Sequence, residues 1–279
     1  MFGSLKLGKL FGIDVFIHGT FWLLPLFVFL SGVVANDVFG AAFDVVVLLG
    51  IFACVALHEA GHALAARHYG IATRDITLYP MGGIARLERM PERPGREIAI
   101  ALAGPIVNFA IAFGILGGAL LGNYLVPLSW VSEHATLAEA FLGRLLIANA
   151  FLGLFNLLPA FPMDGGRVLR AVLSYGMPRL QATRVAVTVG TVLAIVGGFL
   201  GILTASLSLV LVAVVVFVLG RAELAAVHVQ EARKRWHRYY YGDSEDDDDR
   251  YQSDRPPTPG DPHEPIRPAN PAYDFNRKW

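Results

Sequence analysis

Two histidines and a glutamate near residue 60 have the types and the spacing that metal chemistry needs. The segment reads His58-Glu59-Ala60-Gly61-His62. On a helix, His58 and His62 lie on one face, one turn apart, because residues four apart are neighbours there. Two imidazoles so placed can bind one zinc ion, and Glu59 beside the first of them can take a proton from a water molecule. The segment therefore predicts a zinc site with Glu59 as its catalytic residue.

The residues around this motif decide between a metal site and an ordinary pair of core histidines. Residues 52–57 read FACVAL and residues 63–66 read ALAA. Three ionisable groups in so apolar a helix are energetically costly and indicate function. Cys54 is the only cysteine in the sequence, which excludes an internal disulfide and a cysteine-based zinc knuckle, and we interpret it as a small buried hydrophobe.

The composition is typical of a membrane protein. Of 279 residues, 54% are hydrophobic and 16% are charged, which is more apolar and less charged than a soluble domain. The formal net charge is zero, so the chain has no basic field that would attract nucleic acid. We therefore exclude nucleic acid as a partner and expect membrane lipid around the chain.

Six apolar segments are close to or above the ~20 residues that cross ~30 Å of hydrocarbon. Lys and Arg cluster in the stretches 67–96, 167–184 and 221–238 and are missing from the intervening loops 36–41, 123–137 and 203–206. The positive-inside rule then places both termini in the cytoplasm. The predicted fold class is an all-α polytopic protein of the cell membrane, with spans at about 17–35, 42–67, 97–122, 138–158, 184–203 and 205–227.

The fourth predicted span ends in a broken segment that carries a carboxylate. Residues 156–167 read NLLPAFPMDGGR, and each of the two prolines removes a backbone donor. Asp164 is therefore predicted to lie in an unwound segment, with its carboxylate free to act as an oxygen ligand. A catalytic zinc ion needs three protein ligands and one open position. His58, His62 and Asp164 would complete that set, with one zinc ion per chain.

A small β-hairpin is predicted between the second and third spans. In residues 71–87, short β-like runs flank Pro80 and the pair Gly82-Gly83. One interpretation is a membrane-associated strand pair whose edge binds an extended substrate. The other is a plain cytoplasmic hairpin.

The chain divides into four predicted regions. A cytoplasmic or interfacial N-terminal segment precedes the membrane domain, and a basic-aromatic flank at the membrane surface follows it. The final region contains four consecutive aspartates and is rich in proline, which favours disorder. The predicted bounds of the four regions are 1–16, 17–227, 228–241 and 242–279.

The histidine motif together with the segment 156–166 resembles the site-2 protease family of intramembrane zinc metalloproteases, of M50 type. Residues 82–85 (GGIA) and 103–108 (AGPIVN) fit the same family. The short insert between the second and third spans is most similar to the archaeal and sporulation-type branch. Several relatives in that branch carry a nucleotide-sensing CBS pair after the membrane domain, whereas this sequence has the acidic, proline-rich tail.

The resemblance implies a six-helix bundle whose second to fourth helices form the catalytic core. It implies zinc ligation by His58, His62 and Asp164, with Glu59 activating water. It also implies that transmembrane segments of membrane proteins are cleaved, commonly to release a membrane-held signalling protein or transcription regulator. The strand 82–87 would line the substrate path. The residues implied to bind substrate or the oxyanion are Asn156, Gly83, Ile84, Ala85 and Asn108.

A metal transporter or an inactive scaffold is the alternative to a protease. Broken helices with a carboxylate inside the bundle also occur in transporters. Glu59 distinguishes a protease from a transporter, because a protease needs a carboxylate beside the first metal ligand and a transporter does not. The sequence also lacks an inverted repeat between its halves.

Overall fold

The computed structural model of this protein describes residues 3–88, 91, 93–121 and 135–241, with side chains described as far as Trp236. The chain folds as two units, Met1–Ala225 and Ala226–Trp279. The described part of the second unit is the C-terminal end of one helix. The predicted tail 242–279 lies outside the described residues, and the bounds of the four regions stay predictions.

Within the described residues, five helices are long and apolar enough to cross a membrane. They are α2 (Val38–His68), α3 (Pro94–Leu121), α4 (Leu137–Asn156), α6 (Arg179–Leu203) and α7 (Leu207–Tyr241). The first predicted span differs, because its beginning is a β-strand. A four-residue 3₁₀ turn η1 (Gly19–Trp22) and the 12-residue α1 (Leu23–Val34) follow that strand, and together they fall short of the ~20 residues of a full span.

The predicted all-α class is incomplete, because the chain contains a four-stranded sheet of order β1-β2-β3-β4. The predicted hairpin is present as β3 (Thr73–Tyr79) and β4 (Gly82–Leu87). The N-terminal strands β1 (Ser4–Leu10) and β2 (Ile13–His18) extend it. The β2 strand pairs in parallel with β3, whereas the two outer pairs are antiparallel.

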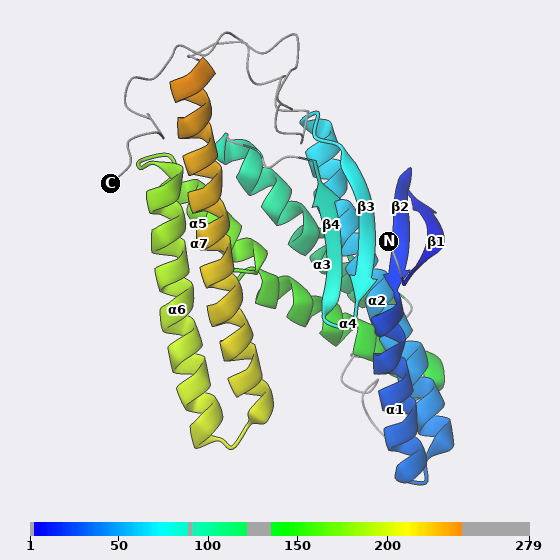
Figure 1. The fold of residues 1–279 in the computed structure, drawn as a ribbon. Coiled ribbons are helices and arrows are strands. Elements are labelled where there is room, and N and C mark those ends of the chain that lie inside the picture. Colours follow the sequence, from blue (N-terminus) through cyan, green and yellow to red (C-terminus); the bar gives the residue numbers. More distant parts are fainter. Residues whose placement is uncertain (1–2, 89–90, 92, 122–134, 242–279) are drawn as a thin grey trace. The chain divides into compact units, whose positions relative to one another are not determined.

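The sheet packs on the part of α2 that carries the histidine motif, and β3 and β4 lie along this helix (Figure 1). Ile13 and Val15 alternate with half-buried residues, as expected of a strand with one face on a core. They pack with Ile76 of β3 against Ala60 and Ala63 of α2. These small side chains on α2 let the sheet approach the helix closely, which brings β4 to the motif.

A short helix, α5 (Asp164–Leu173), follows the broken segment. Asp164 is the first residue of α5, so the prediction that Asp164 lies in unwound chain is wrong by one residue; the unwound part ends at Met163. A Cβ atom on Gly165 would lie 2.2 Å from the carbonyl oxygen of Leu157, so only glycine fits there. The close contact holds the start of α5 against the end of α4.

A buried ion cluster connects α5 to three other helices. The Arg170 guanidinium donates from Nε and Nη2 to Glu97 Oε1 of α3, at 2.8 and 2.5 Å, and from Nη1 to Glu223 Oε1 of α7, at 2.5 Å. Arg179 of α6 donates to Glu97 Oε2 at 3.0 Å. The sequence suggested loop charges for Arg170 and Arg179, but the Arg170 side chain is only 1% exposed. Buried charges persist only when paired, as they are here.

Candidate active site

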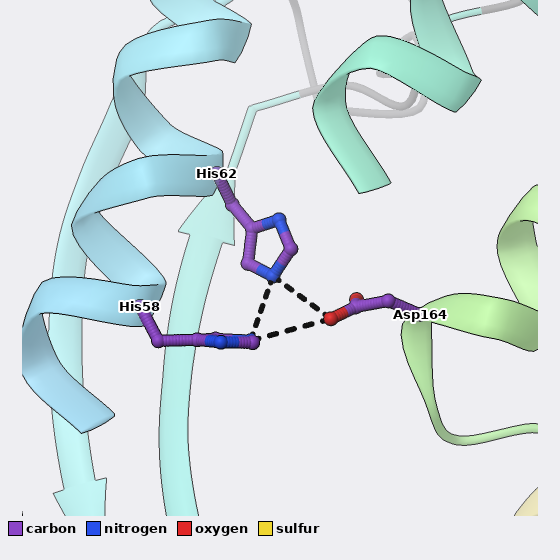
Figure 2. Close-up of side chains that lie close together, drawn as sticks. All are labelled: His58, His62 and Asp164. Atoms are coloured by element: carbon purple, nitrogen blue, oxygen red, sulfur yellow. Dashed lines mark hydrogen bonds and ion pairs between the residues drawn. The ribbon is translucent and has the colours of Figure 1, made fainter. Parts of the chain in front are cut away.

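The α2 helix directs two imidazoles toward the start of α5. The Nε2 atoms of His58 and His62 lie 3.1 Å apart, and both side chains are buried. Figure 2 shows the two rings pointing from neighbouring turns of α2 toward the Asp164 carboxylate. Asp164 Oδ2 lies 3.2 Å from His58 Nε2 and 3.1 Å from His62 Nε2. Three donor atoms from two distant segments thus form a nearly equilateral triangle.

The triangle has the size and the donor types of a zinc site. Zinc bonds of ~2.0–2.1 Å to nitrogen or oxygen in a tetrahedron imply donor atoms about 3.3–3.4 Å apart. His58, His62 and Asp164 are the cluster of metal-ligating side chains found in the described part of the chain. Two nitrogens and one oxygen leave one tetrahedral position free for water or substrate, as in catalytic rather than structural zinc sites.

A hydrogen bond to the backbone determines which ring nitrogen of His62 carries the proton. His62 Nδ1 donates to the carbonyl oxygen of Ile100 at 2.7 Å. A carbonyl oxygen only accepts, so the proton sits on Nδ1 and the lone pair of Nε2 faces the triangle. Histidines that bind metals are commonly oriented by such a bond.

Gly104 of α3 provides the space for both rings. A Cβ atom there would lie 2.3 Å from His62 Nε2 and 2.6 Å from His58 Nε2. Neither ring can move far, because His62 is bonded to Ile100 and both rings are buried. The sequence AGPIVN therefore contributes a glycine that the position of the two rings requires.

We expect Gly104→Ala to weaken zinc binding by at least about tenfold, because the new methyl group displaces the donor atoms from the triangle. Zinc affinity measured by competition with a chromogenic chelator checks this. Gly117→Ala on the same helix is the matched control, since no atom of the described residues, apart from its own turn of helix, lies within 4 Å of its ideal Cβ. Equal zinc affinity of the two variants would contradict the proposed role of Gly104.

Glu59 is held by strand β4. Its Oε2 atom accepts a hydrogen bond from the backbone N–H of Ala85 at 3.1 Å. A Cβ atom on Gly83 would lie 2.7 Å from Glu59 Cγ, so the glycine allows the strand to lie directly on this side chain. The Glu59 carboxylate also interacts electrostatically with both histidines and with Asp164. The catalytic carboxylate predicted from the sequence is thus positioned by the sheet.

Asn108 and Asn156, which were predicted to bind substrate or the oxyanion, have different surroundings. Asn108 of α3 is buried, and neither atom of its amide has a hydrogen-bond partner among the described residues. Asn156 is the last residue of α4 and is half-buried. No hydrogen bond between either amide and the histidines is found in the described part of the chain, so the predicted roles of the two asparagines stay predictions.

Arg167 was not among the predicted site residues, although it ends the sequence DGGR. It lies one turn after Asp164 on α5, with Nη1 3.9 Å from Asp164 Oδ1, the oxygen turned away from the histidines. It also interacts electrostatically with Glu59. The sequence signal was the spacing of three residues, which puts both side chains on one helix face.

Comparison with known proteins finds one matching family. The sequence matches peptidase family M50 over residues 46–125 and 126–197. Zinc metalloprotease MJ0392 of Methanocaldococcus jannaschii is 34% identical over 81% of this chain and 62% of its own length. Stage IV sporulation protein FB of Bacillus subtilis is 25% identical over 62% of this chain and 52% of its own length. The chain thus spans between half and two thirds of these two relatives.

A solved structure has the same fold. The site-2 protease from Methanocaldococcus jannaschii superposes with a TM-score of 0.57 and is 33% identical, covering 79% of this chain and 95% of that one. The similarity to an archaeal and a sporulation protein agrees with the branch that the sequence motifs indicated.

Proposed function

This chain belongs to peptidase family M50, and on that premise we propose that it is an intramembrane zinc metalloendopeptidase. The proposed reaction is hydrolysis of peptide bonds in or near the transmembrane segments of membrane proteins. One observation carries the proposal: a carboxylate, Glu59, lies beside a triangle of two imidazoles and one carboxylate that fits a catalytic zinc ion.

The roles of the side chains follow from their chemistry. A zinc ion held by His58, His62 and Asp164 would make a water molecule more acidic and polarise the scissile carbonyl. Glu59 takes the proton of the attacking water and passes it to the leaving amine nitrogen. The hydrogen bond from Ala85 orients Glu59 for this transfer. The amide of Asn156 or Asn108 is proposed to donate to the oxygen of the carbonyl under attack.

The substrate is proposed to bind as an extended strand beside β4. A helical substrate must unwind before cleavage, and ladder hydrogen bonds to a sheet edge offset the bonds lost on unwinding. In this structure the N–H of Ala85 already donates to Glu59. A substrate strand that pairs at Ala85 competes for that donor, so substrate binding and the orientation of Glu59 are coupled. Ile84, 52% exposed, is available to contact the substrate.

The chain is an integral membrane protein, as its five long apolar helices and its family indicate. We place it in the cell membrane with both termini cytoplasmic, on the distribution of arginines between loops. A membrane-held signalling or transcription regulator is the proposed class of substrate.

A metal transporter or an inactive scaffold is supported less well. Either could use the three metal ligands, but neither needs a carboxylate fixed beside them by a strand of a separate sheet. The Glu59–Ala85 contact therefore favours hydrolysis.

Removal of the metal tests the proposed function. We expect the purified full chain to cleave a detergent-solubilised single-span protein with helix-breaking residues in its span. Dialysis against a chelator abolishes cleavage, and Zn²⁺ restores it, whereas Mg²⁺, which prefers oxygen ligands, does not. Measured cleavage that survives chelation would contradict a zinc protease. Zinc flux into liposomes without cleavage would instead establish the transporter.

A further inference from the structure

Arg167 and Arg170 lie one turn apart on α5 but have opposite environments. All three nitrogens of the Arg170 guanidinium donate to Glu97 or Glu223, and its side chain is 1% exposed. The Arg167 side chain is 32% exposed, and its guanidinium makes no hydrogen bond to any described residue. The side chain of Arg170 therefore stabilises the fold, whereas the N–H groups of the Arg167 guanidinium are available to a ligand.

The position of Arg167 is that of an anion-binding group. Its Nη1 lies 3.9 Å from Asp164 Oδ1, well beyond the ~2.7–2.9 Å of a charge-assisted hydrogen bond. The guanidinium of Arg167 is thus close to the Asp164 carboxylate but makes no hydrogen bond to it. Its charge also acts on Glu59, so one cation interacts electrostatically with both carboxylates of the site.

The charge of the site changes during peptide hydrolysis. The C–N bond breaks, the oxygen of water adds to the carbonyl carbon, and both hydrogens of water end on the amine nitrogen. A neutral amide thus becomes a carboxylate and an ammonium group. With a divalent cation bound, the two carboxylates of Asp164 and Glu59 are neutralised, so Arg167 gives the site an excess positive charge that suits the new carboxylate.

We propose that Arg167 binds the carboxylate formed at the scissile carbonyl, donating hydrogen bonds from the guanidinium that is unoccupied beside Asp164. This inference rests on the proposed function. It makes Arg167 a residue that contacts the cleaved substrate, in addition to the ligands and Glu59. Arginine suits this task because its planar guanidinium donates two parallel bonds to one carboxylate.

The test compares two short apolar peptides that differ only at the C-terminus, one with a free carboxylate and one with an amide. Their affinities for the zinc-loaded full chain are measured by calorimetry in detergent, with zinc content determined on the same samples. We expect the unmodified chain to prefer the carboxylate, and Arg167→Met to reduce that preference by about tenfold, or ~1.4 kcal/mol. Arg167→Lys keeps the charge without the planar donors and should give an intermediate preference.

Arg184→Met is the matched control, because Arg184 is exposed on α6, and its preference should equal that of the unmodified chain. An unchanged preference in Arg167→Met overturns the proposal. So does a preference that falls only together with zinc content, because Arg167 would then act through Asp164. Peptide binding needs no turnover. A chain that discriminates the peptides through Arg167 but cleaves nothing therefore supports this inference while the proposed function fails.

Discussion

Glu59→Gln is expected to abolish detectable cleavage while leaving the zinc site intact. General-base catalysis contributes ~10²–10⁴-fold to such reactions, and an amide cannot take a proton from water. The glutamine side chain has the same shape, and its carbonyl oxygen can still accept the hydrogen bond from Ala85. Turnover of the solubilised membrane substrate, measured with zinc content and thermal stability, separates catalysis from folding.

Glu231→Gln is the control for this change, because it makes the same chemical replacement on α7, far along the chain from the motif. It should retain the turnover of the unmodified chain. Equal turnover of Glu59→Gln and Glu231→Gln would remove Glu59 as the base and leave the site without a proton acceptor.

Asp164→Asn is expected to lose zinc and, with it, cleavage. A neutral amide oxygen is a much weaker ligand than a carboxylate, and the change also removes the ion pair with Arg167. Changes outside the ligand set of zinc sites already cost ~10–100-fold in affinity, so we expect a loss of at least about 100-fold. Competition with a chromogenic chelator measures it.

Asp37→Asn controls for the loss of one negative charge. Asp37 caps α2 through its side chain, and asparagine caps as well as aspartate does. This variant should bind zinc normally. If Asp164→Asn matched it in zinc affinity and in turnover, the triangle would not be the metal site.

The histidine motif could be read from the sequence because its geometry is local. A spacing of four residues on one helix brings His58 and His62 together whatever the rest of the chain does. The structure confirms this proximity at 3.1 Å. Asp164 lies 102 positions beyond His62, so the sequence offered only a candidate ligand, which the resemblance to a family supported. Its contact with both rings depends on the packing of α5.

The helix α5 and the strand β1 were not predicted, and residues 10–17 indicated either an edge strand or an interfacial stretch, for related reasons. Gly165 and Gly166 lower helix propensity, but the close contact of Gly165 with the end of α4 outweighs that preference. The strand β2 alternates only weakly, and its pairing with β3 joins segments separated by two helices. Tertiary contacts of this range leave little signal in a local pattern.

The arginines of α5 show that a count of loop charges does not predict which of them are buried or what they bind. The sequence placed Arg170 in the arginine-rich cytoplasmic stretch 167–184, between two predicted spans. Its exposure and its partners are set by Glu97 and Glu223, which come from α3 and α7. Neither partner can be identified from spacing.

The parallel pairing of β2 with β3 limits how the first part of the chain can cross the bilayer. Ile13–His18 and Thr73–Tyr79 share hydrogen bonds, so the two strands lie side by side and run in the same direction. If α2 crosses the bilayer once, residues 19–37 have to cross it once in the opposite sense, even though α1 alone is too short. That crossing would combine the 3₁₀ turn with α1, and it would put β2 on the same side as the arginine-rich segment after α2.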